Sequence, residues 1–113
     1  MDGATALARW IVSEGLAGRV DVVFGALADK DVEGTFAPLA PLARRVVFVS
    51  PPSPRAAPAE VVAERAGRPG GETAASAAEA VARLDAEPGR TAAPVVVCGS
   101  LYLVGDALRV LRG

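Results

Sequence analysis

The sequence predicts an α/β fold: a doubly wound, mostly parallel sheet with helices on both faces. Three short valine-rich runs, at 20–24, 46–49 and 94–98, have the composition of strands. Stretches with the apolar spacing of helices alternate with them along the chain. Strands that are apolar throughout are usually covered on both faces, and helices between strands favour parallel pairing through right-handed crossovers.

The first predicted helix precedes the first strand. Asp2 can cap it, and Gly15 or Gly18 can end it. Its apolar residues repeat at the spacing of one helical face: Ala4, Leu7, Ala8, Ile11 and Val12. We expect Trp10 to pack against the domain from the face of this helix.

A second helix should follow the strand at 20–24, with Asp29 or Asp31 as its cap. Pro38 and Pro41 lack the backbone N–H that a helix needs, so this helix must be short and lead into an irregular turn. Its expected inward-facing residues are Val32, Phe36 and Leu39.

The second half of the chain continues the alternation. The strand at 46–49 ends in a rigid proline loop at 51–55, and Pro58 suits the first turn of a third helix that Gly67 ends. The apolar face of that helix consists of Ala59, Val62, Ala63 and Ala66. A weak strand at 72–75 would complete the sheet.

The last third predicts a helix, a strand and a closing helix. Ser76 and Glu79 match a capping box, which opens the fourth helix. The strand at 94–98 then leads through a short turn into a final amphipathic helix at 101–111. We expect Cys98, at the end of that strand, to be buried as a small apolar side chain.

Length and composition fit one small domain, residues 1–113, and exclude several classes of site. The apolar fraction of 51% can supply a core, while the net charge of −1 and the scattered charges give no footprint for nucleic acid or a membrane. A single cysteine cannot form an intrachain disulfide, which fits a cytoplasmic protein. Without histidine there is no Ser-His or Cys-His nucleophile and no imidazole metal site, and we expect no bound metal.

Three common nucleotide-binding or signalling motifs are also missing. Lys30, the only lysine, follows Asp29 and not the glycine of a phosphate-binding loop. No G-x-G-x-x-G follows a strand, which argues against dinucleotide binding. The strands do not end in the aspartate that a response-regulator receiver needs.

Three loops should meet at the carboxyl edge of the sheet, where open α/β sheets bind their ligands. They lie at 25–31, 50–55 and 99–100, and they hold the candidate site residues Asp29, Lys30, Asp31, Arg55 and Ser100. Arginine and helix N-termini suit a carboxylate or a phosphate, so the sequence indicates a polar or anionic ligand. Each candidate also has a structural role open to it. The aspartates and the serine can cap helices, and the two basic residues can be solvated surface charges.

Three segments, in order, resemble the C-terminal domain of bifunctional dihydrofolate synthase/folylpolyglutamate synthases, which are Mur ligase relatives. They are the strand-loop-helix V-F-G-A-L-A-D-K-D-V at 23–32, the loop S-P-R-A at 53–56 and the turn G-S-L-Y-L-V-G at 99–105. The opening D-G-A at 2–4 resembles the helix that follows the family's D-G-A-H-N-P segment. The resemblance covers nearly the whole chain, and it implies the Rossmann-like fold of the Mur-ligase C-terminal domain.

The resemblance implies an ATP-dependent ligase of folate biosynthesis. ATP phosphorylates a carboxylate of dihydropteroate or of a folate's glutamyl tail, and the amino group of L-glutamate displaces the phosphate. In this family the C-terminal domain closes over the nucleotide and helps to hold the glutamate. Arg55 and Ser100 would then face the glutamate, while Asp29, Lys30 and Asp31 would line the cleft.

The family's D-G-A-H-N-P segment and its N-terminal ATPase domain, with a G-K-[ST] loop and a folate pocket, are not in this sequence. We therefore expect a domain that is inactive alone and has the ATPase domain as its partner. ATP and Mg would be held mainly by that partner, with none bound to this domain alone. Two alternatives stay open from sequence: a stand-alone interaction or regulatory module, and a small-anion-binding domain of an unrelated α/β protein.

Overall fold

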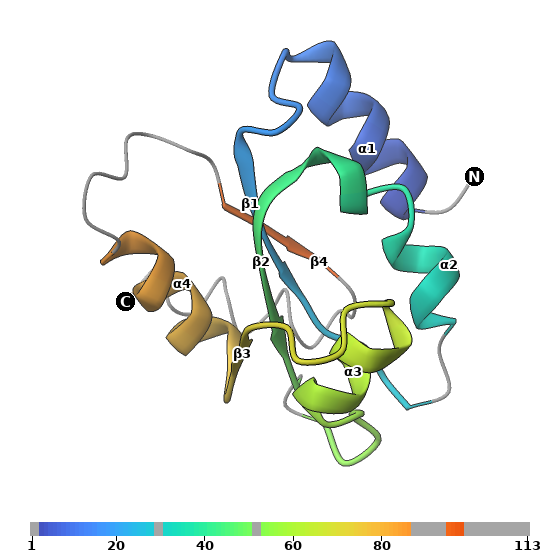
Figure 1. Ribbon diagram of the computed structural model, residues 1–113, viewed down its shortest axis with the longest axis vertical. Coiled ribbons are helices and arrows are strands. Elements are labelled where there is room, and N and C mark those ends of the chain that lie inside the picture. Colours follow the sequence, from blue (N-terminus) through green and yellow to red (C-terminus); the bar gives the residue numbers. More distant parts are fainter. Residues whose placement is uncertain (1–2, 29–30, 51–52, 87–94, 99–113) are drawn as a thin grey trace.

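The computed structural model describes residues 3–28, 31–50, 53–86 and 95–98, which form a parallel sheet between helices (Figure 1). The strands are β1 (Val20–Phe24), β2 (Ala43–Val49), β3 (Thr73–Ala74) and β4 (Val95–Cys98). Their order across the sheet is β3-β2-β1-β4, and all three pairings are parallel. The predicted parallel sheet is confirmed, including the weak strand near 72–75. The turn at 99–100, the helix at 101–111 and the side chain of Cys98 lie outside the described part of the chain.

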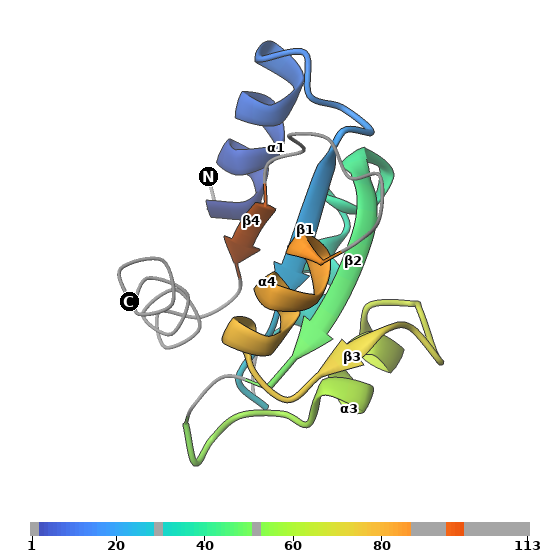
Figure 2. The ribbon, with the colours of Figure 1, turned by 90° about the vertical axis from the view of Figure 1, so that its left-hand side faces the viewer.

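Helices cover both faces of this sheet, as a doubly wound fold requires (Figure 2). They are α1 (Gly3–Ser13), α2 (Val32–Phe36), α3 (Ala59–Arg65) and α4 (Ala77–Asp85), with a 3-10 turn, η1 (Ala40–Leu42), after α2. The first three helices and η1 pack on one face, and α4 packs on the other. α2 is short and leads into η1, as the two prolines predicted.

The two faces have cores of different composition. On the face of α1, α2 and α3, the rings of Phe24, Phe36 and Phe48 are fully buried and meet with centroids 5.3, 5.5 and 6.4 Å apart. The face of α4 is built from smaller side chains: Val23, Val47, Val49, Ala74, Ala77, Ala80, Val81 and Leu84. The aromatic cluster therefore supplies the largest buried side chains of the described core.

Glycine in the left-handed conformation ends two of the helices. Gly15 has φ +70°, and its N–H and that of Leu16 donate to the carbonyls of Val12 and Ile11, which is a Schellman motif. α1 therefore ends at Gly15, which was one of the two glycines predicted to end it. Gly67, at φ +82°, ends α3 as predicted.

The structure corrects two expectations at the amino end of the chain. β2 begins at Ala43, three residues before its predicted start, because Arg44 and Arg45 adopt strand conformation despite their charge. Val12 and Trp10 are 58% and 48% exposed, so neither packs in the core. Ile11 between them is fully buried. α1 therefore buries only a narrow stripe of its surface against the core.

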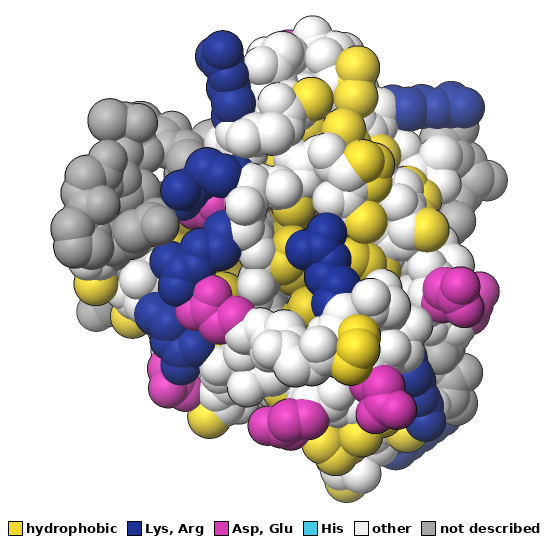
Figure 3. Space-filling model, viewed as in Figure 1, with side chains coloured by type: hydrophobic (Ala, Val, Ile, Leu, Met, Phe, Trp, Pro, Cys, Tyr) yellow, Lys and Arg dark blue, Asp and Glu magenta, His cyan; other side chains and the backbone are white. Residues whose placement is uncertain are grey.

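Ion pairs explain why charged residues open β2. The Arg44 guanidinium donates two hydrogen bonds, of 2.9 and 2.8 Å, to the carboxylate of Asp21, a fully buried residue of β1. Arg45 donates to both carboxylate oxygens of Glu72 at 2.8 and 2.6 Å, and Arg83 of α4 reaches the same carboxylate at 3.3 Å. Basic and acidic side chains accordingly lie side by side on the β3–α4 side of the molecule (Figure 3).

Acid should weaken the fold through Glu72. The hydrogen bonds from Arg45 hold the pKa of Glu72 below its ordinary value of about 4.5, against the opposing effect of desolvation. A carboxyl with a lowered folded-state pKa stabilises the fold above its unfolded pKa, and the contribution is lost as the pH falls through the folded-state pKa. We expect Glu72→Gln to lower the free energy of unfolding by about 1 kcal/mol at neutral pH and by much less once the pH falls below the folded-state pKa of Glu72.

Urea melts of both proteins at the two pH values would measure this difference. In an Arg45→Gln background the Glu72→Gln substitution should cost little at either pH, because the strongest partner of the carboxylate is gone. A cost that stays the same in acid would contradict the assigned role of Glu72.

Candidate functional site

Two of the three predicted site loops lie in contact at the carboxyl edge of the sheet. The β1–α2 loop follows Phe24, and the β2–α3 loop follows Val49. The Ala28 N–H donates to the Arg55 carbonyl at 2.8 Å, and the Ala57 N–H donates to the Ala26 carbonyl at 3.1 Å. Leu27 and Ala56 thereby form an isolated antiparallel bridge. We call these paired segments, 26–28 and 55–57, the loop ribbon. They confirm that the sheet brings the two loops together.

Arg55 lies on the ribbon with an exposed side chain. Its backbone N–H donates to Ser53 Oγ at 3.2 Å, and its carbonyl accepts from Ala28. The main chain around Arg55 is therefore fixed by hydrogen bonds on both sides, as the prolines of this loop led us to expect. Arg55 is therefore an exposed residue at the carboxyl edge of the sheet.

Asp31 is the N-cap of α2. Its Oδ1 accepts a hydrogen bond of 3.0 Å from the Gly34 N–H, and a Cβ on Gly34 would collide with the carboxylate. This assigns to Asp31 the structural role that the sequence left open between two aspartates. The other candidates, Asp29, Lys30 and Ser100, lie outside the described residues.

Arg65 is a contact of this site that the sequence did not single out. Its Nη1 donates to the Ala28 carbonyl at 2.8 Å, although the two residues are 37 positions apart. In the sequence it is the basic residue of a helix's last turn, where it favours the helix dipole, and nothing there distinguishes it from a surface charge.

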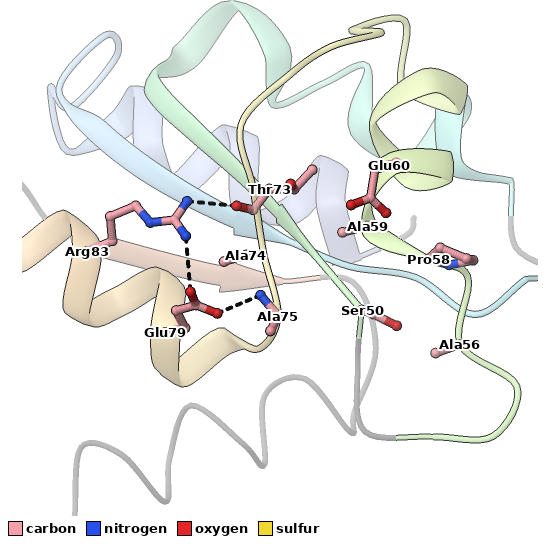
Figure 4. A pocket seen from close by; sticks show the side chains of 10 residues that line it. All are labelled: Ser50, Ala56, Pro58, Ala59, Glu60, Thr73, Ala74, Ala75, Glu79 and Arg83. Carbon is pink, nitrogen blue, oxygen red and sulfur yellow. Dashed lines mark hydrogen bonds and ion pairs between the residues drawn. The ribbon is translucent and has the colours of Figure 1, made fainter.

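A pocket of about 530 Å³ opens beside the ribbon, between the first residues of α3 and α4 (Figure 4). Its polar lining on the α4 side is bonded internally: Glu79 accepts from the Ala75 N–H at 2.8 Å and from Arg83 at 3.2 Å. Arg83 also donates to the Thr73 carbonyl at 2.7 Å. Neither Arg55 nor Asp31 lines the pocket. These groups hold the start of α4.

The described residues contain neither a helix that could span a membrane nor a cluster of metal ligands. Of the helices in 3–86, none is both long and apolar enough to cross a membrane. Within the same described ranges, no three cysteine, aspartate or glutamate side chains are grouped closely enough to hold a metal ion.

Residues 1–101 match the family described as Mur ligase, glutamate ligase domain. The chain belongs to this family. The match confirms the resemblance seen in the loop motifs. No match was found among curated proteins.

Solved structures similar to this Mur ligase domain are folylpolyglutamate synthases. E. coli FolC in complex with DHPP and ADP superposes with a TM-score of 0.82 at 32% identity, covering 96% of this chain and 26% of FolC. Mycobacterium tuberculosis folylpolyglutamate synthase complexed with ADP gives 0.74 at 31% identity, covering 98% of this chain and 27% of that one. The bifunctional folylpolyglutamate synthase/dihydrofolate synthase from Yersinia pestis, complexed with AMPPNP and Mn, gives 0.73 at 28%, with 96% and 27% covered. The Mur ligase domain thus spans about a quarter of each relative.

Proposed function

We propose that this chain is the glutamate-positioning, C-terminal domain of an ATP-dependent ligase that adds L-glutamate to dihydropteroate or folate. The observation that carries the proposal is the match to E. coli FolC, at 32% identity over 96% of this chain. The loop ribbon supports it, because it presents Arg55 at the edge where open α/β sheets bind ligands. The parent enzyme would work in the cytoplasm.

In the proposed reaction the amino group of glutamate attacks an acyl phosphate. The new amide bond forms, the bond from carbonyl carbon to phosphate oxygen breaks, and the amine loses its proton. Arg55 binds a carboxylate of the incoming glutamate through two parallel hydrogen bonds, which fixes the amine relative to the carbonyl. Ser100 would contact the same substrate, and Asp29 and Lys30 would line the cleft. Asp31 caps the start of α2.

The partner in this proposal is an N-terminal ATPase domain of the same enzyme. The described residues offer no grouped carboxylates for a metal, and the sequence has no G-K-[ST] loop. We therefore place ATP and Mg mainly on the partner domain. The chain's own contribution is to hold glutamate and to exclude water when the domains close.

A chimera tests the proposal. The matched segment of M. tuberculosis folylpolyglutamate synthase would be replaced by this chain, and phosphate release would be followed with folate or dihydropteroate as acceptor. We expect turnover that depends on L-glutamate, and none from the enzyme with the segment deleted. A folded chimera with no more glutamate-dependent turnover than the deletion would contradict the proposal.

The 113-residue chain alone should fold cooperatively and release no phosphate from ATP in the presence of glutamate and dihydropteroate. The reason is that the residues proposed to bind ATP belong to the partner domain. A single thermal transition, together with a phosphate assay, checks both parts. Folate-dependent ATP turnover by the purified chain would show that it carries its own nucleotide site.

A further inference from the structure

Both backbone polar groups of Ala28 are hydrogen-bonded. Its N–H donates to the Arg55 carbonyl within the loop ribbon, at 2.8 Å. The carbonyl of the same residue accepts 2.8 Å from Nη1 of Arg65. Ala28 is the last described residue before Asp29 and Lys30, and Asp31 then caps α2. The side chain of Arg65 therefore contacts the segment that leads into the candidate site residues.

Arg65 makes this contact from a firmly placed helix. Val62 and Ala63 of α3 are 0% and 1% exposed, and the Schellman bonds at Gly67 fix the helix end directly after Arg65. The hydrogen bond from Arg65 to Ala28 is charge-assisted, which makes it stronger than a neutral one. The hydrogen bond from Arg65 joins the loop ribbon to α3, whose inner face is buried. The two hydrogen bonds within the ribbon join the β1–α2 loop only to the β2–α3 loop.

We infer that Arg65 is a positioning residue of the ligase: it holds Ala28, and through it the β1–α2 loop, in the place where the loop meets the substrate. The identity of the substrate rests on the proposed function. The positioning of Ala28 by Arg65 rests on the hydrogen bonds described above. Small displacements of substrate-positioning groups lower rates strongly, by up to about 100-fold per ångström. We therefore expect the loss of Arg65 to affect glutamate use more than stability.

The 113-residue chain allows a test that needs no substrate. In Arg65→Ala, amide hydrogen exchange at Ala28 and Ala57 should become roughly 3- to 10-fold faster, because their ribbon bonds open more often. Arg68→Ala is the matched control. Arg68 also donates to a backbone carbonyl, that of Ala40 at 3.2 Å, and it stacks over the Phe36 ring, away from the ribbon. That variant should leave both amides unchanged.

The chimera then tests the role in the reaction. Arg65→Ala should raise the KM for glutamate roughly 3- to 10-fold and leave the KM for ATP unchanged, and Arg65→Lys should recover part of the loss through its single ammonium donor. Arg68→Ala should change neither constant. Unchanged exchange in Arg65→Ala, or faster exchange with an unchanged glutamate KM, would overturn the inference. A wild-type chimera without glutamate-dependent turnover would contradict the proposed function instead. The exchange experiment would still show whether Arg65 holds the loop ribbon in place.

Discussion

Phe24→Ala should lower the free energy of unfolding of the domain by about 3–5 kcal/mol. Phe24 is fully buried and meets the rings of Phe36 and Phe48 edge to face, so its removal leaves a cavity between two fixed aromatic rings. Small domains are stable by only about 5–15 kcal/mol in total, so the loss would be a large share. Urea or thermal melts of the 113-residue chain would measure it.

Two variants make this experiment specific. Phe24→Leu keeps most of the volume and should cost about 1.5 kcal/mol or less. Val12→Ala removes an apolar side chain that is 58% exposed and should change stability by less than about 0.5 kcal/mol. If Phe24→Ala were no worse than Val12→Ala, the aromatic cluster would not be the centre of the core.

Arg55→Ala should weaken glutamate use by the chimera roughly 10- to 100-fold, the equivalent of about 1.5–3 kcal/mol for a hydrogen bond to a charged group. The ribbon and the neighbouring prolines already restrain the loop, so little entropy is lost when the guanidinium binds a carboxylate. Arg55→Lys should recover only part of the loss, because an ammonium cannot form the same pair of parallel bonds.

The same substitution should change the melting temperature of the isolated chain only slightly. The side chain of Arg55 is exposed, and the bonds that fix the ribbon come from the main chain. Steady-state kinetics of the chimera and a melt of the domain would separate the alternatives. Unchanged kinetics would make Arg55 a surface charge, and a drop of several degrees would make it a structural residue.

The sequence predicted the elements whose signals are local. Valine-rich runs become the inner strands because parallel strands buried on both faces are apolar throughout. The cap of α4 is also local: Ser76 Oγ accepts from the Glu79 N–H, although the Glu79 carboxylate bonds the N–H of Ala75 and not that of Ser76. Two residues three positions apart suffice to recognise such a cap.

Contacts between distant residues were not predictable in this way. Arg44 and Arg45 can lie in β2 because each is paired with a carboxylate. These partners lie 23 and 27 positions away in the sequence, so no local pattern shows them. Arg65 and Ala28 are a third case. Val12 and Trp10 were misassigned for another reason: their spacing fits a broad apolar face, but the neighbours of α1 cover only a narrow stripe.

The candidate site was predictable as a place more than as a set of roles. The rule that ligands bind at the carboxyl edge pointed to the two loops, and the structure brings Arg55 into contact with Ala28 of the β1–α2 loop. It also gives Asp31 a capping role that the sequence offered equally to Asp29. Both precede the helix in sequence, and the hydrogen bond from the Gly34 N–H identifies Asp31 as the cap.

The loop ribbon also bears on how such a domain can change over generations. The bonds that join its two segments run between main-chain atoms of Ala26, Ala28, Arg55 and Ala57, so substitutions at the partly exposed Leu27 and Ala56 between them leave these bonds in place. A mutation at Leu27 or Ala56 can therefore alter what the edge presents while the backbone keeps its course. Libraries randomised at these two positions should retain folded members at high frequency.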